Sequence, residues 1–152
     1  MKNKLEYIRH VPLFTSLGDE ELGFLATLLT SHTFKADHCI VHANEPGNAL
    51  FIIVEGQVNV LLQGKNVQPI VINELGPGDF FGEMSLIDEQ PRSADVVCVT
   101  PVTCLQLNRA DFQKTIHRYP TLMSELLKEL CLRLRHANDM IRGVNISQMY
   151  IY

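Results

Sequence analysis

The sequence has 152 residues and a formal net charge of −4, with 46% hydrophobic and 20% charged residues. This length fits about one domain with a substantial core, and the composition is that of a soluble globular protein. The negative charge argues against a general nucleic-acid-binding surface, which needs clustered Lys and Arg. Apolar runs such as residues 49–54 are too short to span a bilayer, and residues 1–6 lack the apolar core of a signal peptide, so a cytoplasmic location is expected.

Residues 1–31 are predicted to form an N-terminal helical segment of the same domain. Residues 4–10 fit a short helix that Pro12 ends. Residues 16–21 then resemble a helix start with acids in the first turn, and leucines through Leu29 supply its apolar face.

From residue 32 to 107 the pattern changes to short β-rich runs separated by turn residues, which is typical of a sandwich or jelly roll. The predicted strands are residues 32–35, 39–42, 49–54, 57–62, 68–74, 80–81, 95–99 and 102–107. Between two of these runs, Glu55-Gly56 predicts a tight hairpin with Gly56 at positive φ. The four cysteines, Cys39, Cys98, Cys104 and Cys131, have no C-x-x-C spacing, so we expect reduced, mostly buried thiols and no metal site.

Residues 108–143 are predicted to be helical and residues 144–152 to be a short tail. Asn108 can cap a helix over 109–118, and a longer helix over 121–142 can end at Gly143. In the longer helix a heptad-like seam is formed by Met123, Leu127, Leu130, Leu134, Ala137, Ile141 and Val144. The seam fits two readings equally: packing on the helix's own domain, or a parallel dimer.

The stretch from residue 80 to 94 has the features of an anion site. Gly82 permits a tight turn before a short helical run over 83–87, whose first amides lack intrahelical acceptors. Arg92 offers a planar, permanently charged fork for a phosphate, and Ser93 adds a hydroxyl. Glu83 is out of place beside a phosphate unless it accepts hydrogen bonds from a group such as a ribose hydroxyl.

Another reading treats the same residues as ordinary surface. Gly82-Glu83 would then be a simple turn, and Arg92 an exposed charge paired with Asp88 or Glu89.

Residues 81–86 and 91–96 resemble the phosphate-binding cassette of the cyclic nucleotide-binding domain family. That family includes the bacterial catabolite activator protein, the regulatory subunits of cAMP-dependent kinase and the cytoplasmic domains of cyclic-nucleotide-gated channels. The resemblance extends from about Val11 to Arg142. It implies a mostly β fold, a double-stranded β-helix (jelly roll) with N-terminal helices and a C-terminal helical pair. Asp37 and Asn44 stand where the family pattern has glycine, and both residue types tolerate the left-handed conformation.

By this resemblance Glu83 binds the ribose 2′-hydroxyl and Arg92 binds the cyclic phosphate. The implied cradle consists of Gly82, Glu83, Met84, Ser85, Arg92, Ser93 and Ala94. For the base, we expect an apolar wall at Val71 and Ile72, and polar contacts from Arg133 and Asn138 on the last helix. Each of these helix residues taken singly also fits an ordinary solvated face. In the activator protein the comparable region carries hydroxyl residues, where this chain has Ala137-Asn138, which leaves base selectivity open.

The expected function is a non-enzymatic sensor that binds a cyclic nucleotide and moves its C-terminal helix over the base. We expect cAMP as the ligand, with cGMP as the other candidate, no metal, and no catalytic residues. Because the sequence stops soon after the helix, we expect no DNA-binding domain of its own and no membrane association. The expected partners are a homodimer mate through the C-terminal helix and an unidentified downstream protein.

Two alternative functions fit parts of the sequence. One is a ligand-independent dimerisation module on the same fold, which the presence of both Glu83 and Arg92 argues against. The other, less favoured, is a cupin-type metal enzyme, suggested by His38, His42 and Glu45. Cupin sites use an H-x-H pair, and this spacing does not match it.

Overall fold

The computed structural model describes residues 4–64 and 67–149, without the side chains of residues 84, 85 and 143–149. Two four-stranded antiparallel sheets face each other, with strand orders β1-β8-β3-β6 and β2-β7-β4-β5. The strands are β1 (Thr30–Phe34), β2 (Cys39–Val41), β3 (Ala49–Glu55), β4 (Val58–Leu62), β5 (Ile70–Leu75), β6 (Phe80–Phe81), β7 (Asp95–Cys98) and β8 (Val102–Asn108). The helices are α1 (Lys4–Ile8), the 3-10 turn η1 (Pro12–Phe14), α2 (Asp19–Leu28), α3 (Glu83–Asp88), α4 (Arg109–Arg118) and α5 (Thr121–Met149).

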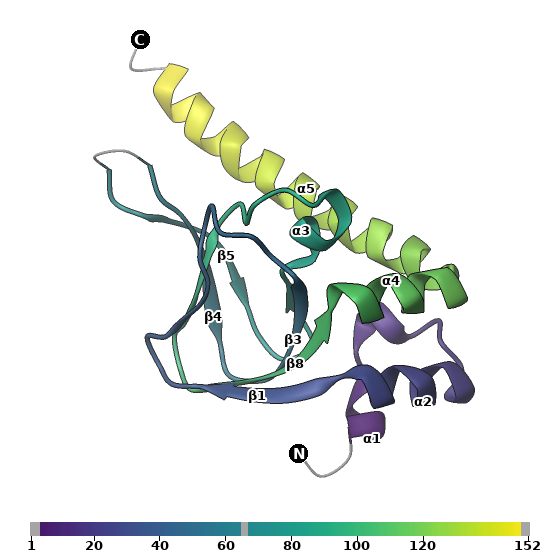
Figure 1. The fold of residues 1–152 in the computed structure, drawn as a ribbon. Helices are drawn as coiled ribbons and strands as arrows, with labels where there is room; N and C mark the ends of the chain where they lie inside the picture. The colour runs from purple at the N-terminus through teal and green to yellow at the C-terminus, as the bar shows by residue number, and fades with distance from the viewer. Residues whose placement is uncertain (1–3, 65–66, 150–152) are drawn as a thin grey trace.

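The predicted fold class, mostly β with flanking helices, is confirmed. Each of the predicted strands is present, with ends that differ by a residue or two. Figure 1 shows α1, α2 and α4 gathered on one side of the β-roll, while the long α5 passes across it. Among the described residues, no helix combines the length and the apolar character that crossing a membrane requires.

Strand β3 lies at the centre of the domain and is buried on both faces. Leu50 and Ile52 belong to the core that the helices share with the first sheet. Phe51 and Ile53, which point the other way, belong to the core between the two sheets. The Phe51 ring stacks on Phe81 of β6, with centroids 5.1 Å apart, and this contact helps to fix the strand that leads into the cassette.

The predicted hairpin at Glu55-Gly56 is wrong. Gly56 has the expected positive φ of 95°, but β3 and β4 pair with different neighbours and lie in different sheets. The turn therefore passes the chain from one sheet to the other. The left-handed conformations expected for Asp37 and Asn44 are confirmed, with φ of 71° and 69°.

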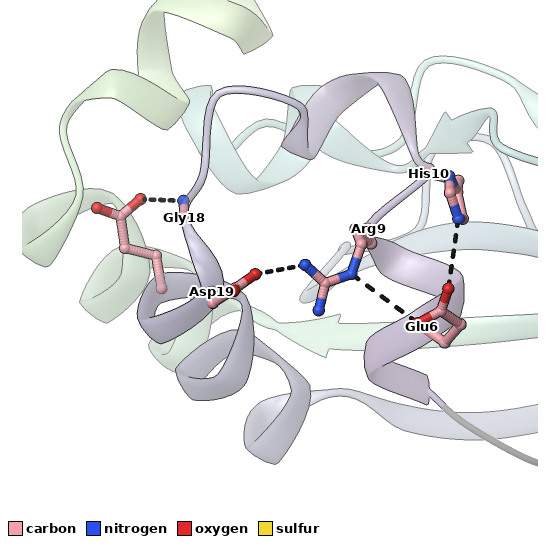
Figure 2. Close-up of polar contacts among 6 residues, drawn as sticks. Glu6, Arg9, His10, Gly18 and Asp19 are labelled. Atoms are coloured by element: carbon pink, nitrogen blue, oxygen red, sulfur yellow. Dashed lines mark hydrogen bonds and ion pairs between the residues drawn. The ribbon is translucent and has the colours of Figure 1, made fainter.

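The N-terminal helices are linked by polar contacts (Figure 2). Arg9, just after α1, forms an ion pair with Asp19 at the start of α2, and its Nε lies 3.9 Å from Glu6 Oε2. At the start of α2, the Gly18 N–H donates to Glu21 Oε2 at 3.1 Å. The predicted helix start with acids in its first turn is thus confirmed, with Gly18 at the cap.

The C-terminal helices begin as predicted, but the second ends later. The Asn108 side chain accepts a hydrogen bond from the Asp111 N–H at 2.8 Å and caps α4. Helix α5 continues through Gly143 to Met149, so the predicted end at Gly143, and with it the tail from residue 144, is wrong. A helix tolerates a single interior glycine at a cost of about 1 kcal/mol, which is too little to stop it.

Candidate functional site

A cavity of about 450 Å³ lies between the second sheet, the cassette and α5. Its wall is mainly apolar, with three charged side chains. The lining residues are Val41, Val60, Ile72, Asn73, Leu75, Phe81, Gly82, Glu83, Arg92, Ser93, Ala94, Val96, Leu130, Arg133, Leu134, His136 and Ala137. An apolar cavity of this size with a few convergent polar groups is typical of a small-molecule site.

Gly82 makes the close packing of the cassette possible. Its φ is 91°, a conformation that other residues adopt only with strain. A Cβ at this position would lie 2.6 Å from the Ala49 carbonyl oxygen and 2.7 Å from Arg92 Nη1. Glycine therefore lets the arginine approach the turn, and α3 begins directly after it at Glu83.

Arg92 is held in place by main-chain groups. Its Nη1 donates to the Gly82 carbonyl at 2.7 Å and its Nη2 to the Ala49 carbonyl at 2.9 Å. Its own N–H donates to the Glu45 carbonyl at 2.8 Å, which fixes the backbone as well. Arg92 is only 8% exposed, so the alternative reading of an exposed surface charge paired with Asp88 or Glu89 is wrong.

Burial also affects the charge of Arg92. Loss of hydration lowers the pKa of its guanidinium below the ordinary value. The Glu83 carboxylate partly offsets this effect, and the nearby positive charge of Arg109 adds to it. A guanidinium that has lost hydration and has a cationic neighbour is well placed to attract an anion.

Glu83, directly after Gly82, is buried and is bound to helix α5. Arg133 Nη1 lies 3.0 Å from Glu83 Oε1, and Arg133 Nη2 donates to the Phe80 carbonyl oxygen. The Arg133 guanidinium also lies over the Phe80 ring, 4.0 Å from its centroid. These contacts anchor α5 to the cassette through one side chain.

The charges around the cavity do not cancel. Arg92 and Arg133 carry two positive charges against the single negative charge of Glu83, all three on side chains that line the cavity. The excess positive charge in a largely apolar enclosure favours a ligand with one anionic group and an otherwise apolar or weakly polar body.

Most of the residues proposed from the sequence converge on this cavity. Those that line it are Ile72, Gly82, Glu83, Arg92, Ser93, Ala94 and Arg133. Val71, which is 40% exposed, and Asn138, which is also exposed, are not among the lining residues. The side chains of Met84 and Ser85 lie outside the described residues.

Sequence reasoning missed most of the apolar wall. The missed lining residues are Val41, Val60, Asn73, Leu75, Phe81, Val96, Leu130, Leu134, His136 and Ala137. Strand alternation carried part of the signal, because Val96 is buried between the partly exposed Asp95 and Val97 of a predicted strand. On α5 the predicted seam already contained Leu130, Leu134 and Ala137, but the sequence left open whether the seam packs on the domain or on a second copy.

The cysteines are free, as expected, but only some are buried. Cys98 and Cys104 are buried, Cys39 is half-buried and Cys131 is exposed.

The family profile for "Cyclic nucleotide-binding domain" matches residues 31–119. The chain is 39% identical over 132 residues to a cyclic nucleotide-gated potassium channel of Mesorhizobium japonicum, an alignment that covers 87% of this chain and 35% of the channel. It is 34% identical over 127 residues to the cyclic AMP receptor protein of Thermus thermophilus, covering 84% of this chain and 59% of the relative. The chain thus spans less than two thirds of the length of either relative.

The fold is also similar to those of solved cyclic nucleotide-binding proteins. A cyclic nucleotide-binding domain from Methylobacillus flagellatus superposes with a TM-score of 0.80 at 30% identity, covering 92% of this chain and 81% of that one. The catabolite activator protein of Thermus thermophilus gives a TM-score of 0.79 at 32% identity, covering 88% and 63%. With the family profile, the fold and the cassette in agreement, this chain belongs to the cyclic nucleotide-binding domain family.

Proposed function

We propose that this chain is a regulatory, non-catalytic domain that binds cAMP in the cavity beneath α5. The observation that carries the proposal is that Arg92 and Glu83, two buried side chains of opposite charge, line the same cavity. The cavity volume of about 450 Å³ is in the range of small-molecule sites.

Each polar group has a distinct role in this proposal. Arg92 binds the cyclic phosphate, with its guanidinium already fixed by the Gly82 and Ala49 carbonyls. Because its fork is pre-positioned, little side-chain entropy is lost on binding. Oε2 of Glu83 accepts a hydrogen bond from the ribose 2′-hydroxyl, while Oε1 remains paired with Arg133.

The apolar wall and α5 cover the base. Leu130 and Ala137 line the cavity from the helix, and Val60 and Ile72 line it from the second sheet. In this arrangement His136 and Ala137, rather than Asn138, are the helix residues that meet the base. We choose cAMP over cGMP because a relative that is 34% identical is a cyclic AMP receptor protein.

Ligand binding is proposed to act through α5. The helix touches the cassette through the Arg133–Glu83 pair, so a ligand that engages Glu83 also changes how firmly α5 is held. A change in the position or order of α5 is the signal passed to a downstream protein.

The experiment is isothermal titration of the purified, nucleotide-stripped protein with cAMP, cGMP and AMP. We expect saturable binding of one equivalent of cAMP, weaker cGMP binding and no measurable AMP binding. Arg92→Ala should weaken cAMP binding by about 2–5 kcal/mol, roughly 30- to several-thousand-fold, because it removes the partner of a buried anion.

The control variant is Arg135→Ala, which removes an exposed arginine from the same helix that carries Arg133. It should bind cAMP as the unmodified protein does. Absence of heat with both cyclic nucleotides, from a folded protein shown to be empty, would refute the assignment.

A second role, self-association, is supported by an exposed apolar stripe on α5, of which Leu134 also lines the cavity. Leu127, Leu134 and Ile141 are 55%, 62% and 56% exposed and are spaced seven residues apart, the repeat of a coiled-coil seam. We propose that two copies dimerise along this stripe. Sedimentation should show a dimer that Leu127→Gln with Ile141→Gln dissociates, whereas Leu132→Gln, at an equally exposed position off the stripe, leaves it intact.

A further inference from the structure

We propose that Cys39, His42 and Asp95 form a binding site for a divalent transition-metal ion of the zinc class. Each residue offers one ligand atom, a thiol sulfur, an imidazole nitrogen and a carboxylate oxygen, and these atoms lie within 4.8 Å of one another. The site is on the second sheet, where β2 pairs with β7, and none of its three residues lines the nucleotide cavity.

A β-bulge brings Cys39 and His42 to the same face. In a regular strand, residues three apart point to opposite faces. Here the register with β7 shifts between Cys39 and Val41, so that Ile40 is an extra residue in β2. Ile40 and Val41 both pack into the core between the sheets, which leaves Cys39 and His42 together on the outer face.

The third residue comes from the neighbouring strand. In β7, Val96 is buried in the core between the sheets, so Asp95 and Val97 point outward. Val97 is opposite Cys39 in the ladder, and Asp95 follows on the same face toward His42. The site therefore joins two strands and is a product of the fold, since Asp95 is more than fifty residues from the other two in sequence.

The donor set fits a borderline-soft cation. Thiolate, imidazole and carboxylate are the ligand types of zinc, at distances of about 2.0–2.3 Å, and three such ligands leave a fourth position for water. Ligand atoms within 4.8 Å of one another reach this geometry through side-chain rotation with a modest movement of the strands.

The surroundings of Asp95 favour a cation as well. The Ala43 N–H donates to Asp95 Oδ1 at 2.7 Å, which orients the carboxylate as outer hydrogen bonds do in metal sites. Within the part of the chain that the structure describes, no Lys or Arg forms an ion pair with Asp95. A metal ion would supply the missing positive charge.

The site lies close to the cassette along both strands. Just beyond His42, the Asn44 N–H donates to the Arg92 carbonyl at 2.8 Å, and Asp95 is three residues past Arg92. A bound ion would therefore join the two chain segments that position Arg92.

The test is titration of the chelator-treated 152-residue chain with Co²⁺ under anaerobic conditions, followed by competition with Zn²⁺. We expect one equivalent of Co²⁺ to give a thiolate-to-cobalt charge-transfer band in the near ultraviolet, which Zn²⁺ abolishes. Cys39→Ser should eliminate the band. His42→Gln and Asp95→Asn should weaken Co²⁺ binding by at least about tenfold, since each removes a ligand.

Two matched variants serve as controls. Cys131→Ser removes an exposed thiol elsewhere, and His38→Gln removes a neighbouring imidazole that stacks on Phe34. Both should keep the band and the one-to-one stoichiometry. Asp95→Asn retains an acceptor for the Ala43 N–H, and its melting temperature without metal checks that it is folded. Absence of a band, a band that survives in Cys39→Ser, or one lost in either control would overturn the proposal.

Discussion

Arg133 of α5 forms an ion pair with Glu83 of the cassette, with 3.0 Å between Nη1 and Oε1. The pair is largely shielded from water, because the two side chains are 21% and 8% exposed. Arg133 also donates to the Phe80 carbonyl oxygen and lies over the Phe80 ring. One side chain thus connects the helix that covers the cavity to the carboxylate that we assign to the ribose.

Replacing this arginine should loosen the cover without removing the phosphate partner. We predict that Arg133→Ala weakens cAMP binding by about 1.5–3 kcal/mol, the usual value of a hydrogen bond to a charged group. The loss should come mainly from faster dissociation, because α5 opens more easily. Stopped-flow displacement of a fluorescent cAMP analogue measures this rate. Arg135→Ala should dissociate as the unmodified protein does, and an unchanged rate in Arg133→Ala would show that the pair does not hold the cover.

The role of Glu83 can be isolated with a modified ligand. If its carboxylate accepts the ribose 2′-hydroxyl, Glu83→Gln should weaken cAMP binding by about 1.5–3 kcal/mol, since the acceptor loses its charge. The same substitution should weaken the binding of 2′-deoxy-cAMP less, because that ligand lacks the hydroxyl and only the lost ion pair with Arg133 contributes. The four titrations form a double-mutant cycle with a coupling free energy that measures the contact. Equal losses for both ligands would place Glu83 away from the ribose.

The cassette could be predicted from the sequence because its chemistry is local. Gly82, Glu83 and Arg92 lie within a dozen residues, and their types and spacing resemble the family's cassette. The burial of Arg92 itself depends on the Ala49 carbonyl, 43 residues away, and could not be predicted this way. The strands were predictable for a similar reason. The alternation of apolar and polar residues within a strand, and the turn residues at its ends, can be recognised within a few neighbouring positions.

Contacts between distant segments could not be predicted. The pairing of Arg133 with Glu83 joins residues fifty positions apart, and only the packing of α5 determines it. The placement of β3 and β4 in different sheets is likewise decided by their partners, because a glycine turn such as Gly56 fits a hairpin and a sheet-to-sheet crossing equally well. The bulge that gathers Cys39 and His42 depends on the register with β7.

A methyl group at Gly82 should disturb both stability and binding. Gly82→Ala must adopt a φ of 91° and place its Cβ 2.6 Å from a backbone oxygen that can move little. We predict a loss of about 1–3 kcal/mol in the free energy of unfolding from strain alone, and much weaker cAMP binding because Arg92 is displaced. Urea unfolding and titration measure the two effects.

The matched control is Gly23→Ala in the middle of α2, where a Cβ would meet no atom within 4 Å. There alanine should stabilise the protein by about 0.5–1 kcal/mol through its better helix propensity. If the two substitutions had the same effect, the requirement for glycine at position 82 would be disproved.

Thiol reactivity should separate the cysteines according to burial. Loss of hydration raises the pKa of the Cys104 thiol to about 12, so at a pH of about 8 it stays protonated and is a poor nucleophile. Cys131 is exposed on α5 and accessible to reagents. We predict that iodoacetamide, followed by peptide mapping, modifies Cys131 in the fast phase and Cys104 only as the protein opens. Cys131→Ser should remove the fast phase, and denaturant should make Cys104 react quickly. Modification of Cys104 in the folded protein as fast as that of Cys131 would contradict the buried position of its side chain in the core between the two sheets.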